Sequence, residues 1–173
     1  MADKIIVLSG KQYSGKDTVA KILLKKLTGF RRVGIGDAIK LEYSKRTGLS
    51  VEEIEKNKAT YRPDLINLGD EGRAISDTYW LEALVKLDGN LIIPDMRLKK
   101  ELAFFKKFDA ITIRVNSTYE NRCQRGTVVK DNDLTETDLD DITDWNYVIE
   151  NNSTYEDLVE NADLLIEDLK KRF

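Results

Sequence analysis

The chain reads GKQYSGKDT from Gly10 to Thr18, directly after the apolar run IIVLS at residues 5–9. An apolar run of this length predicts a buried strand, and the pattern after Thr18 predicts a helix. Gly10 and Gly15 allow the connecting backbone to take conformations closed to other residues, so that successive N–H groups point inward. Lys16 adds a positive charge, and the start of the helix adds its dipole. The stretch therefore predicts a loop that binds phosphate groups.

This loop departs at one position from the common pattern, in which the Lys is followed by a Ser or Thr that binds Mg²⁺. Asp17 follows Lys16 here, and Thr18 comes one position later. We expect the Asp17 carboxylate to bind the ion, either directly or through a water. The residues predicted to bind a nucleotide cofactor at the loop are Gly10, Lys11, Ser14, Gly15, Lys16, Asp17 and Thr18.

The composition limits the chemistry of the chain. Its 173 residues contain no histidine, which excludes histidine-based acid–base catalysis and histidine metal ligands. Carboxylates, Lys and Arg remain, and phosphoryl transfer suits this set because it depends on positioning and charge neutralisation. The net charge of −3 is dispersed, so we expect no nucleic-acid partner.

Length and cysteine content indicate the kind of protein. A chain of 173 residues is long enough for one well-buried core, so we predict a single domain. Cys123 is the only cysteine, which excludes an internal disulfide. We find no signal-peptide pattern and no long apolar run, and we expect a cytoplasmic protein that does not bind membranes.

Short apolar runs alternate with helical patterns along the chain. The runs lie at residues 4–9, 31–35, 90–94, 109–115 and 146–150. Runs that are apolar on both faces predict parallel strands with helices on either side. We therefore predict an α/β fold with a doubly wound, parallel, five-stranded sheet.

The helical patterns predict where the crossovers begin and end. We expect helices at 18–27, after a cap at Asp37, after a capping box at Ser50, within 60–88 with a break at Gly69 and Gly72, near 98–108, and after Ser153. Tyr79 and Trp80 lie in the fourth of these helices, and core packing explains them better than base stacking.

Two segments are longer than a crossover requires, at about 37–75 and 117–144. Ligands of open α/β sheets bind beyond the carboxyl ends of the strands, so these insertions are predicted to overhang the phosphate site as an acceptor-binding segment and a lid. The second insertion carries an acidic run from Asp131 to Asp144. We expect most of these carboxylates to lie in solvent.

Asp95 and Arg97 follow the run at 90–94, which we expect to lie beside the strand of the phosphate loop. Asp95 can hold Mg²⁺ together with Asp17, and Arg97 can bind a phosphate through two parallel hydrogen bonds, so both also count as substrate-binding residues. The alternatives are that Asp95 caps the 98–108 helix and that Arg97 forms a surface ion pair.

Four further arginines are candidate site residues. Arg122 and Arg125 are three positions apart on a predicted helix, so both can face the phosphates and neutralise charge in the transition state. The alternative is that they pair with the acidic run that follows. Arg62 and Arg73 can hold the phosphate of an acceptor, or can be solvated helix residues.

The stretch from Asp144 to Asn152 contains the last apolar run and the turn that follows it. A turn at this place often touches the nucleotide base, so Asn151 is a candidate for binding adenine. Its alternative role is to cap the last helix.

In order and spacing, these motifs resemble a small group of P-loop kinases: the phage-type deoxynucleoside monophosphate kinases and the animal-type phosphomevalonate kinases. Both have an Asp after the loop Lys. The resemblance rests on residues 9–17, 37–40, 94–101, 122–126 and 144–151. It implies a P-loop nucleoside monophosphate kinase-like fold, MgATP as the donor, a phosphorylated small molecule as the acceptor and a lid that carries arginines.

The resemblance is divided between two acceptors. Residues 73–80 and 94–95 look like the nucleotide kinases, whereas 121–126 and 148–151 look like phosphomevalonate kinase. Our first hypothesis is a kinase acting on a nucleoside or deoxynucleoside monophosphate, as a monomer or homodimer. Phosphomevalonate is the first alternative, and a nucleotide-binding regulatory module without turnover is the second.

Overall fold

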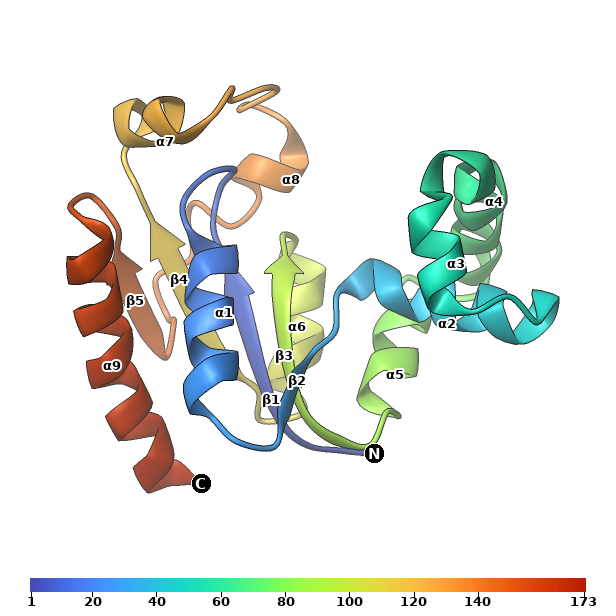
Figure 1. The fold of residues 1–173 in the computed structure, drawn as a ribbon, viewed down its shortest axis with the longest axis horizontal. Helices are drawn as coiled ribbons and strands as arrows, with labels where there is room; N and C mark the ends of the chain where they lie inside the picture. Colours follow the sequence, from blue (N-terminus) through green and yellow to red (C-terminus); the bar gives the residue numbers. More distant parts are fainter.

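The sheet at the centre of the computed structural model, which describes residues 1–173, has the strand order β2-β3-β1-β4-β5. All neighbouring strands are parallel, so their carboxyl ends share one edge, at the top of Figure 1. The strands are β1 (Ala2–Ser9), β2 (Phe30–Arg32), β3 (Gly89–Met96), β4 (Ile111–Asn116) and β5 (Tyr147–Glu150). The predicted sheet is confirmed, although β2 ends earlier than expected.

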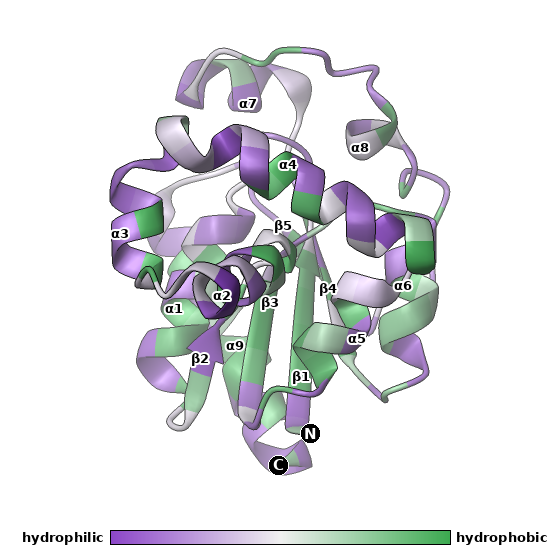
Figure 2. Cartoon of the chain, turned by 90° about the vertical axis from the view of Figure 1, so that its right-hand side faces the viewer, coloured by the Kyte–Doolittle hydropathy of each residue, from purple (hydrophilic) through white to green (hydrophobic).

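Alternate residues of the central strands face opposite layers of helices. In β1, Ile5 and Val7 join the core under α5 (Tyr79–Val85) and α6 (Lys99–Lys106). Ile6 and Leu8 join the core under α1 (Lys16–Lys26) and α9 (Tyr155–Arg172). Figure 2 shows the hydrophobic β1 and β3 between these layers. No helix has the length and apolar character that a membrane span requires.

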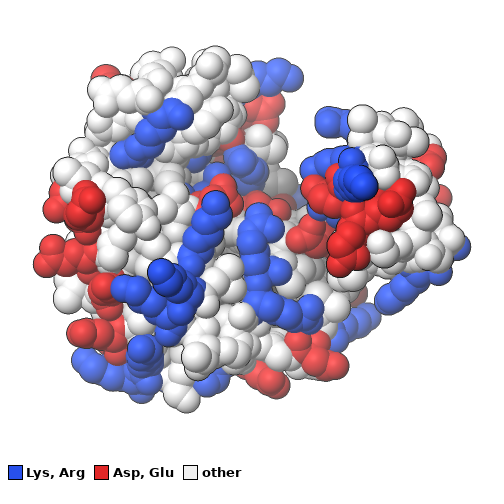
Figure 3. All heavy atoms as spheres, viewed as in Figure 1, with Lys and Arg blue, Asp and Glu red and all other residues white.

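The two insertions leave the sheet at its carboxyl edge. Between β2 and β3 lie α2 (Ile35–Thr47), α3 (Val51–Lys56) and α4 (Lys58–Ile75), which stand to one side of the sheet in Figure 1. Between β4 and β5 lie α7 (Tyr119–Arg125) and α8 (Leu134–Thr137), which lie beyond the strand ends. The cleft between the two insertions is visible in Figure 3.

The predicted break at Gly69 and Gly72 is wrong, because α4 continues to Ile75. A Cβ at Gly72 would lie 2.5 Å from the indole of Trp80, so glycine at this position makes room for a buried ring. The Trp80 indole N–H donates to the carbonyl of Gly69 at 3.0 Å. Trp80 thus packs in the core, as predicted, and holds α4 against α5.

Two predicted helix starts are displaced. Asp37 is the third residue of α2 and not its cap, and its carboxylate accepts the N–H of Gly34 at 2.7 Å. The last helix is capped by Thr154, one residue after the predicted Ser153. Ser50 caps α3 as predicted, since its hydroxyl accepts the N–H of Glu53.

Candidate active site

The phosphate loop joins β1 to α1 and requires glycine at two positions. Gly15 has a φ of 100°, and a Cβ there would lie 2.3 Å from the side-chain nitrogen of Asn151. A Cβ at Gly10 would lie 2.5 Å from the carbonyl oxygen of Val115. The Asn151 amide donates to the carbonyl of Ser14 at 2.8 Å, so this residue stabilises the conformation of the loop. Its predicted contact with a nucleotide base stays a prediction.

A cavity of 410 Å³ opens in front of the loop, and we call it the donor cavity. Its lining residues are Gln12, Tyr13, Gly15, Lys16, Asp17, Thr18, Arg97 and Arg125. Burial lowers the pKa of Lys16, and the charge of Arg97 lowers it further, while the carboxylates of Asp17 and Glu136 oppose both effects. Three cationic side chains around one cavity make it suited to a polyanion.

The lid arginines both reach the loop but have different partners. Arg125 donates to the carbonyls of Tyr13 at 3.2 Å and Asn151 at 2.8 Å, and it lines the donor cavity. Arg122 is only 3% exposed and makes two parallel hydrogen bonds to Asp131, at 2.8 and 3.1 Å. The alternative of pairing with the acidic run therefore describes Arg122, whereas the contact of Arg125 with phosphate stays a prediction.

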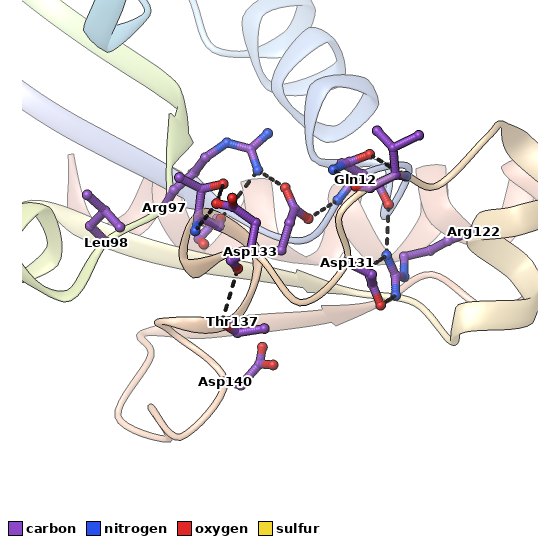
Figure 4. A network of polar contacts seen from close by, with 12 residues as sticks. Gln12, Arg97, Leu98, Arg122, Asp131, Asp133, Thr137 and Asp140 are labelled. Carbon is purple, nitrogen blue, oxygen red and sulfur yellow. Dashed lines mark hydrogen bonds and ion pairs between the residues drawn. The ribbon is translucent and has the colours of Figure 1, made fainter.

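Most carboxylates of the acidic run are exposed, as expected, and Glu136 is the exception. Figure 4 shows part of the polar network that it forms with the loop and β3. Glu136 is almost completely buried, accepts the N–H of Gln12 at 2.7 Å and pairs with Arg97. Asp140 pairs with Lys11 at 2.7 Å.

Sequence reasoning missed Glu136, although one signal was available. The loop and the lid supply several cations to a single site, and a site that excludes water needs countercharges nearby. The acidic run is where the sequence offers them. The burial of one member of the run depends on contacts between residues more than a hundred positions apart in the sequence. The spacing of the residues alone does not predict such contacts.

Asp95 and Arg97 lie at the end of β3, between two cavities. The Asp95 carboxylate accepts the N–H of Ile35, with both oxygens at 3.0 Å, so it caps α2. The alternative that it caps α6 is wrong, because Leu98 occupies that position. Burial raises the pKa of Asp95, and the hydrogen bond from Ile35 opposes this shift. Arg97 pairs with Glu136 inside the site and not at the surface.

Asp17 lies in the first turn of α1 with an exposed carboxylate. Its oxygen lies 3.8 Å from the guanidinium of Arg32. The structure has no group of three or more carboxylate, Cys or His side chains arranged to hold a metal. The proposed pair of metal-binding carboxylates, Asp17 and Asp95, stays a prediction.

A second cavity, of 590 Å³, lies between the end of β3 and the helices α2 to α4, and we call it the acceptor cavity. Its lining residues are Arg32, Gly34, Gly36, Asp37, Ile39, Lys40, Glu55, Lys58, Arg62, Leu65, Ile66, Arg73 and Asp95. Five are cations, three are carboxylates and none is aromatic. Figure 3 shows Lys and Arg side chains near the opening of the cleft. Arg62 and Arg73, predicted to bind an acceptor, both line this cavity.

A third cavity, also of 590 Å³, lies where β4 and β5 end, and Lys11 and Arg114 line it. The guanidinium of Arg114 lies 5.7 Å from the centre of the Trp145 ring and 3.0 Å from Asp140. Because Lys11 belongs to the phosphate loop, this cavity borders the donor side of the site.

Two sequence comparisons identify the family. The family model described as phosphomevalonate kinase matches residues 8–110. The chain is also 30% identical over 189 residues to the phosphomevalonate kinase of Drosophila melanogaster, and the match covers 98% of each chain. The chain belongs to the phosphomevalonate kinase family. It is therefore a kinase.

Solved structures support the fold of this family member. Shikimate kinase from Acinetobacter baumannii, in complex with shikimate, has a TM-score of 0.57 at 18% identity, and the match covers 98% of this chain and 94% of that one. Shikimate kinase from Aquifex aeolicus vf5 has a TM-score of 0.52 at 21% identity, with 98% of each chain covered. Both likenesses agree with the predicted P-loop kinase fold.

Proposed function

We propose that this kinase transfers the γ-phosphoryl group of ATP to the phosphate of phosphomevalonate, which yields ADP and a diphosphate. The observation that carries the proposal is the composition of the acceptor cavity, with five cations and no aromatic side chain. Phosphomevalonate presents both a phosphate and a carboxylate, and each needs cationic partners. The family match and the Drosophila relative support the same acceptor.

A nucleoside monophosphate, our first hypothesis from the sequence, fits this cavity less well. A nucleobase requires an apolar or aromatic slot with hydrogen-bonding groups at its edge. Trp80, which lies in the stretch that resembles the nucleotide kinases, is buried between α4 and α5 and does not line the cavity. The apolar lining consists of Ile39, Leu65 and Ile66.

On the donor side, we place the triphosphate of ATP in the donor cavity. The loop N–H groups and Lys16 would hold the phosphates, and Arg97 and Arg125 would neutralise the charge that develops during transfer. Arg122 would act on the phosphates only indirectly, because its guanidinium is paired with Asp131.

Mg²⁺ fits the carboxylates at this site. The ion is commonly bound by one or two carboxylates together with substrate phosphates. Asp17 lines the donor cavity and Asp95 lines the acceptor cavity, so the pair spans the place where the two phosphate groups would meet. Bound there, the ion would neutralise phosphate charge in the transition state.

For the acceptor, we propose that Arg62 and Arg73 bind its anionic groups while Asp95 and Arg97 border its phosphate. Arg73 already pairs with Asp70 at 2.6 Å, and both side chains of this pair are largely exposed. An exposed ion pair of this kind contributes little to stability. An anionic group of the acceptor can therefore replace Asp70 as the partner of Arg73 at a small cost in free energy. We also propose that residues 1–173 form one domain, in which 37–75 and 117–144 are insertions.

An ADP-release assay tests the proposal. The purified protein is supplied with MgATP and, in turn, phosphomevalonate and each common nucleoside and deoxynucleoside monophosphate. We expect turnover with phosphomevalonate and none in a Lys16→Ala control. Preference for a nucleotide would restore our first hypothesis, and ATP binding without turnover on any acceptor would favour the regulatory module.

A further inference from the structure

Glu136 lies deep in the site although it belongs to the lid. It is on α8, and its side chain is only 2% exposed, whereas its neighbours Leu134 and Thr135 are exposed. A buried carboxylate is costly unless charged or hydrogen-bonding partners surround it. The contacts of Glu136 therefore explain why α8 lies against the site.

Each carboxylate oxygen of Glu136 has a different partner. Oε2 accepts the N–H of Gln12 in the phosphate loop at 2.7 Å, and Oε1 accepts from Nη1 of Arg97 at the end of β3. Nη1 of Arg97 also lies 3.4 Å from the carbonyl of Thr135. One side chain thus links three parts of the site that are far apart in sequence.

The charge of Glu136 matters as well as its shape. Arg97 and Lys16 both line the donor cavity, and their like charges repel each other. The negative charge of Glu136 lies next to Arg97 and offsets this repulsion. Without this negative charge, the repulsion from Lys16 would favour conformations in which the Arg97 side chain turns from the cavity towards solvent.

We propose that Glu136 is a positioning residue for phosphoryl transfer, which holds Arg97 at the donor cavity and fastens the lid to the phosphate loop. The inference rests on the proposed function for the reaction itself. Glu136 does not line the donor cavity, and both of its oxygens are used by the protein. It therefore acts through Arg97 and the loop and does not touch the transferred group.

Glu136→Gln tests the positioning role with little change in volume. Both partners of the carboxylate are donors, and an amide has only one acceptor oxygen, so at least one contact must break. We expect kcat to fall roughly 10- to 100-fold, because small displacements of a positioned group slow transfer strongly. ATP affinity, measured by calorimetry, should stay within about twofold or become tighter, since a negative charge is lost near the phosphates.

Two further variants separate positioning from a general loss of structure. Glu120→Gln makes the same charge change at an exposed position of α7 and should leave kcat unchanged. In an Arg97→Ala background, Glu136→Gln should lower kcat by clearly less than in the wild type, because the contact to Arg97 is already absent and only the contact to the phosphate loop is left to lose. A full additional loss in that background would overturn the proposal.

Amide hydrogen exchange without any acceptor keeps this test independent of the proposed function. Glu136→Gln should speed exchange both in the phosphate loop and across residues 117–144, and Glu120→Gln should not. If exchange in these two segments is unchanged, the inference is wrong whatever the kinetics show. If the wild-type protein does not act on phosphomevalonate, the proposed function fails, and the exchange result still decides the role of Glu136.

Discussion

The two insertions carry similar charged residues but pair them over different distances. In the lid, Asp131, Glu136 and Asp140 bind cations from α7, from the residue after β3 and from the phosphate loop. In the acceptor insertion, several pairs join residues three or four positions apart, such as Arg73 with Asp70, and Lys40 and Arg46 also pair with Glu55 and Glu71 of the same insertion. The lid pairs include almost completely buried side chains and fix geometry, whereas the pair of Arg73 and Asp70 is largely exposed and leaves Arg73 available at the acceptor cavity.

The contrast suggests that the lid is organised before substrate arrives, while the acceptor insertion is completed by its ligand. Lid residues should then affect kcat and lid opening, and cations of the acceptor insertion should affect the KM of the acceptor. The following predictions test this division, from the largest expected effect to the smallest.

Asp17→Ala should have the largest effect, because Asp17 lines the donor cavity and is one of the two carboxylates proposed to hold Mg²⁺. We expect turnover to fall by about two orders of magnitude and the Mg²⁺ concentration for half-activity to rise, as expected for lost metal-based charge stabilisation. Binding of metal-free ATP should be unchanged or slightly tighter. Steady-state kinetics over a series of Mg²⁺ concentrations measure turnover and the Mg²⁺ dependence, and calorimetry measures the affinity for metal-free ATP.

An unaltered Mg²⁺ dependence would contradict this role for Asp17. The residue would then only complement the dipole at the start of α1, and the metal would be held elsewhere.

Arg62→Ala should weaken the binding of the acceptor and leave the other kinetic parameters nearly unchanged. A lost charged hydrogen bond to the acceptor should raise its KM by about tenfold, while kcat and the KM for ATP change little. Lys45→Ala is the matched control, because Lys45 lies on α2 in the same insertion but does not line the acceptor cavity. An equal rise in the KM of the acceptor for both variants would indicate that the loss of any positive charge in this insertion weakens acceptor binding. That result would contradict the proposed division of roles between the two insertions.

The smallest expected effect is the pH dependence of the lid. Hydrogen bonds from Arg122 lower the pKa of Asp131 below its ordinary value of 3.8, although partial burial opposes this shift. Because the folded pKa is depressed, the pair stabilises fully at neutral pH, and this contribution is lost as the pH falls below 3.8 towards the folded pKa.

Denaturant unfolding of the wild type and Asp131→Asn across this range measures the effect. The difference in unfolding free energy should be constant near neutral pH and should narrow in acid. A difference that does not change with pH would mean that the ionised form of Asp131 contributes nothing. The side chain is 28% exposed, so a modest effect is expected.

Local patterns were enough to predict the sheet and the phosphate loop. Five apolar runs gave the strands, and Gly10 and Gly15 marked positions that the structure shows to be closed to a Cβ. The position of the two insertions at one edge of the sheet also follows from their place after strands, because parallel strands end at one edge. These features depend on residues close in sequence or on general topology.

The errors came from contacts between distant residues. Gly69 and Gly72 suggested a break, but the Trp80 ring packs on α4 at these positions, so the helix continues. Asp95 suggested a cap for the next helix, yet it reaches sixty residues back to Ile35. The order of the acceptor hypotheses changed for another reason: the family model and the Drosophila relative are phosphomevalonate kinases, and no aromatic side chain lines the acceptor cavity.

The tryptophans give the two insertions separate optical signals. The chain has only two, and Trp80 is packed on α4 in the acceptor insertion, whereas Trp145 is half-buried beside Arg114 just after the lid. Intrinsic fluorescence therefore reports on both regions without an attached dye. Trp80→Phe leaves an emitter near the lid, and Trp145→Phe leaves one packed against α4, so stopped-flow traces of the two variants can time the response of each insertion to its own ligand.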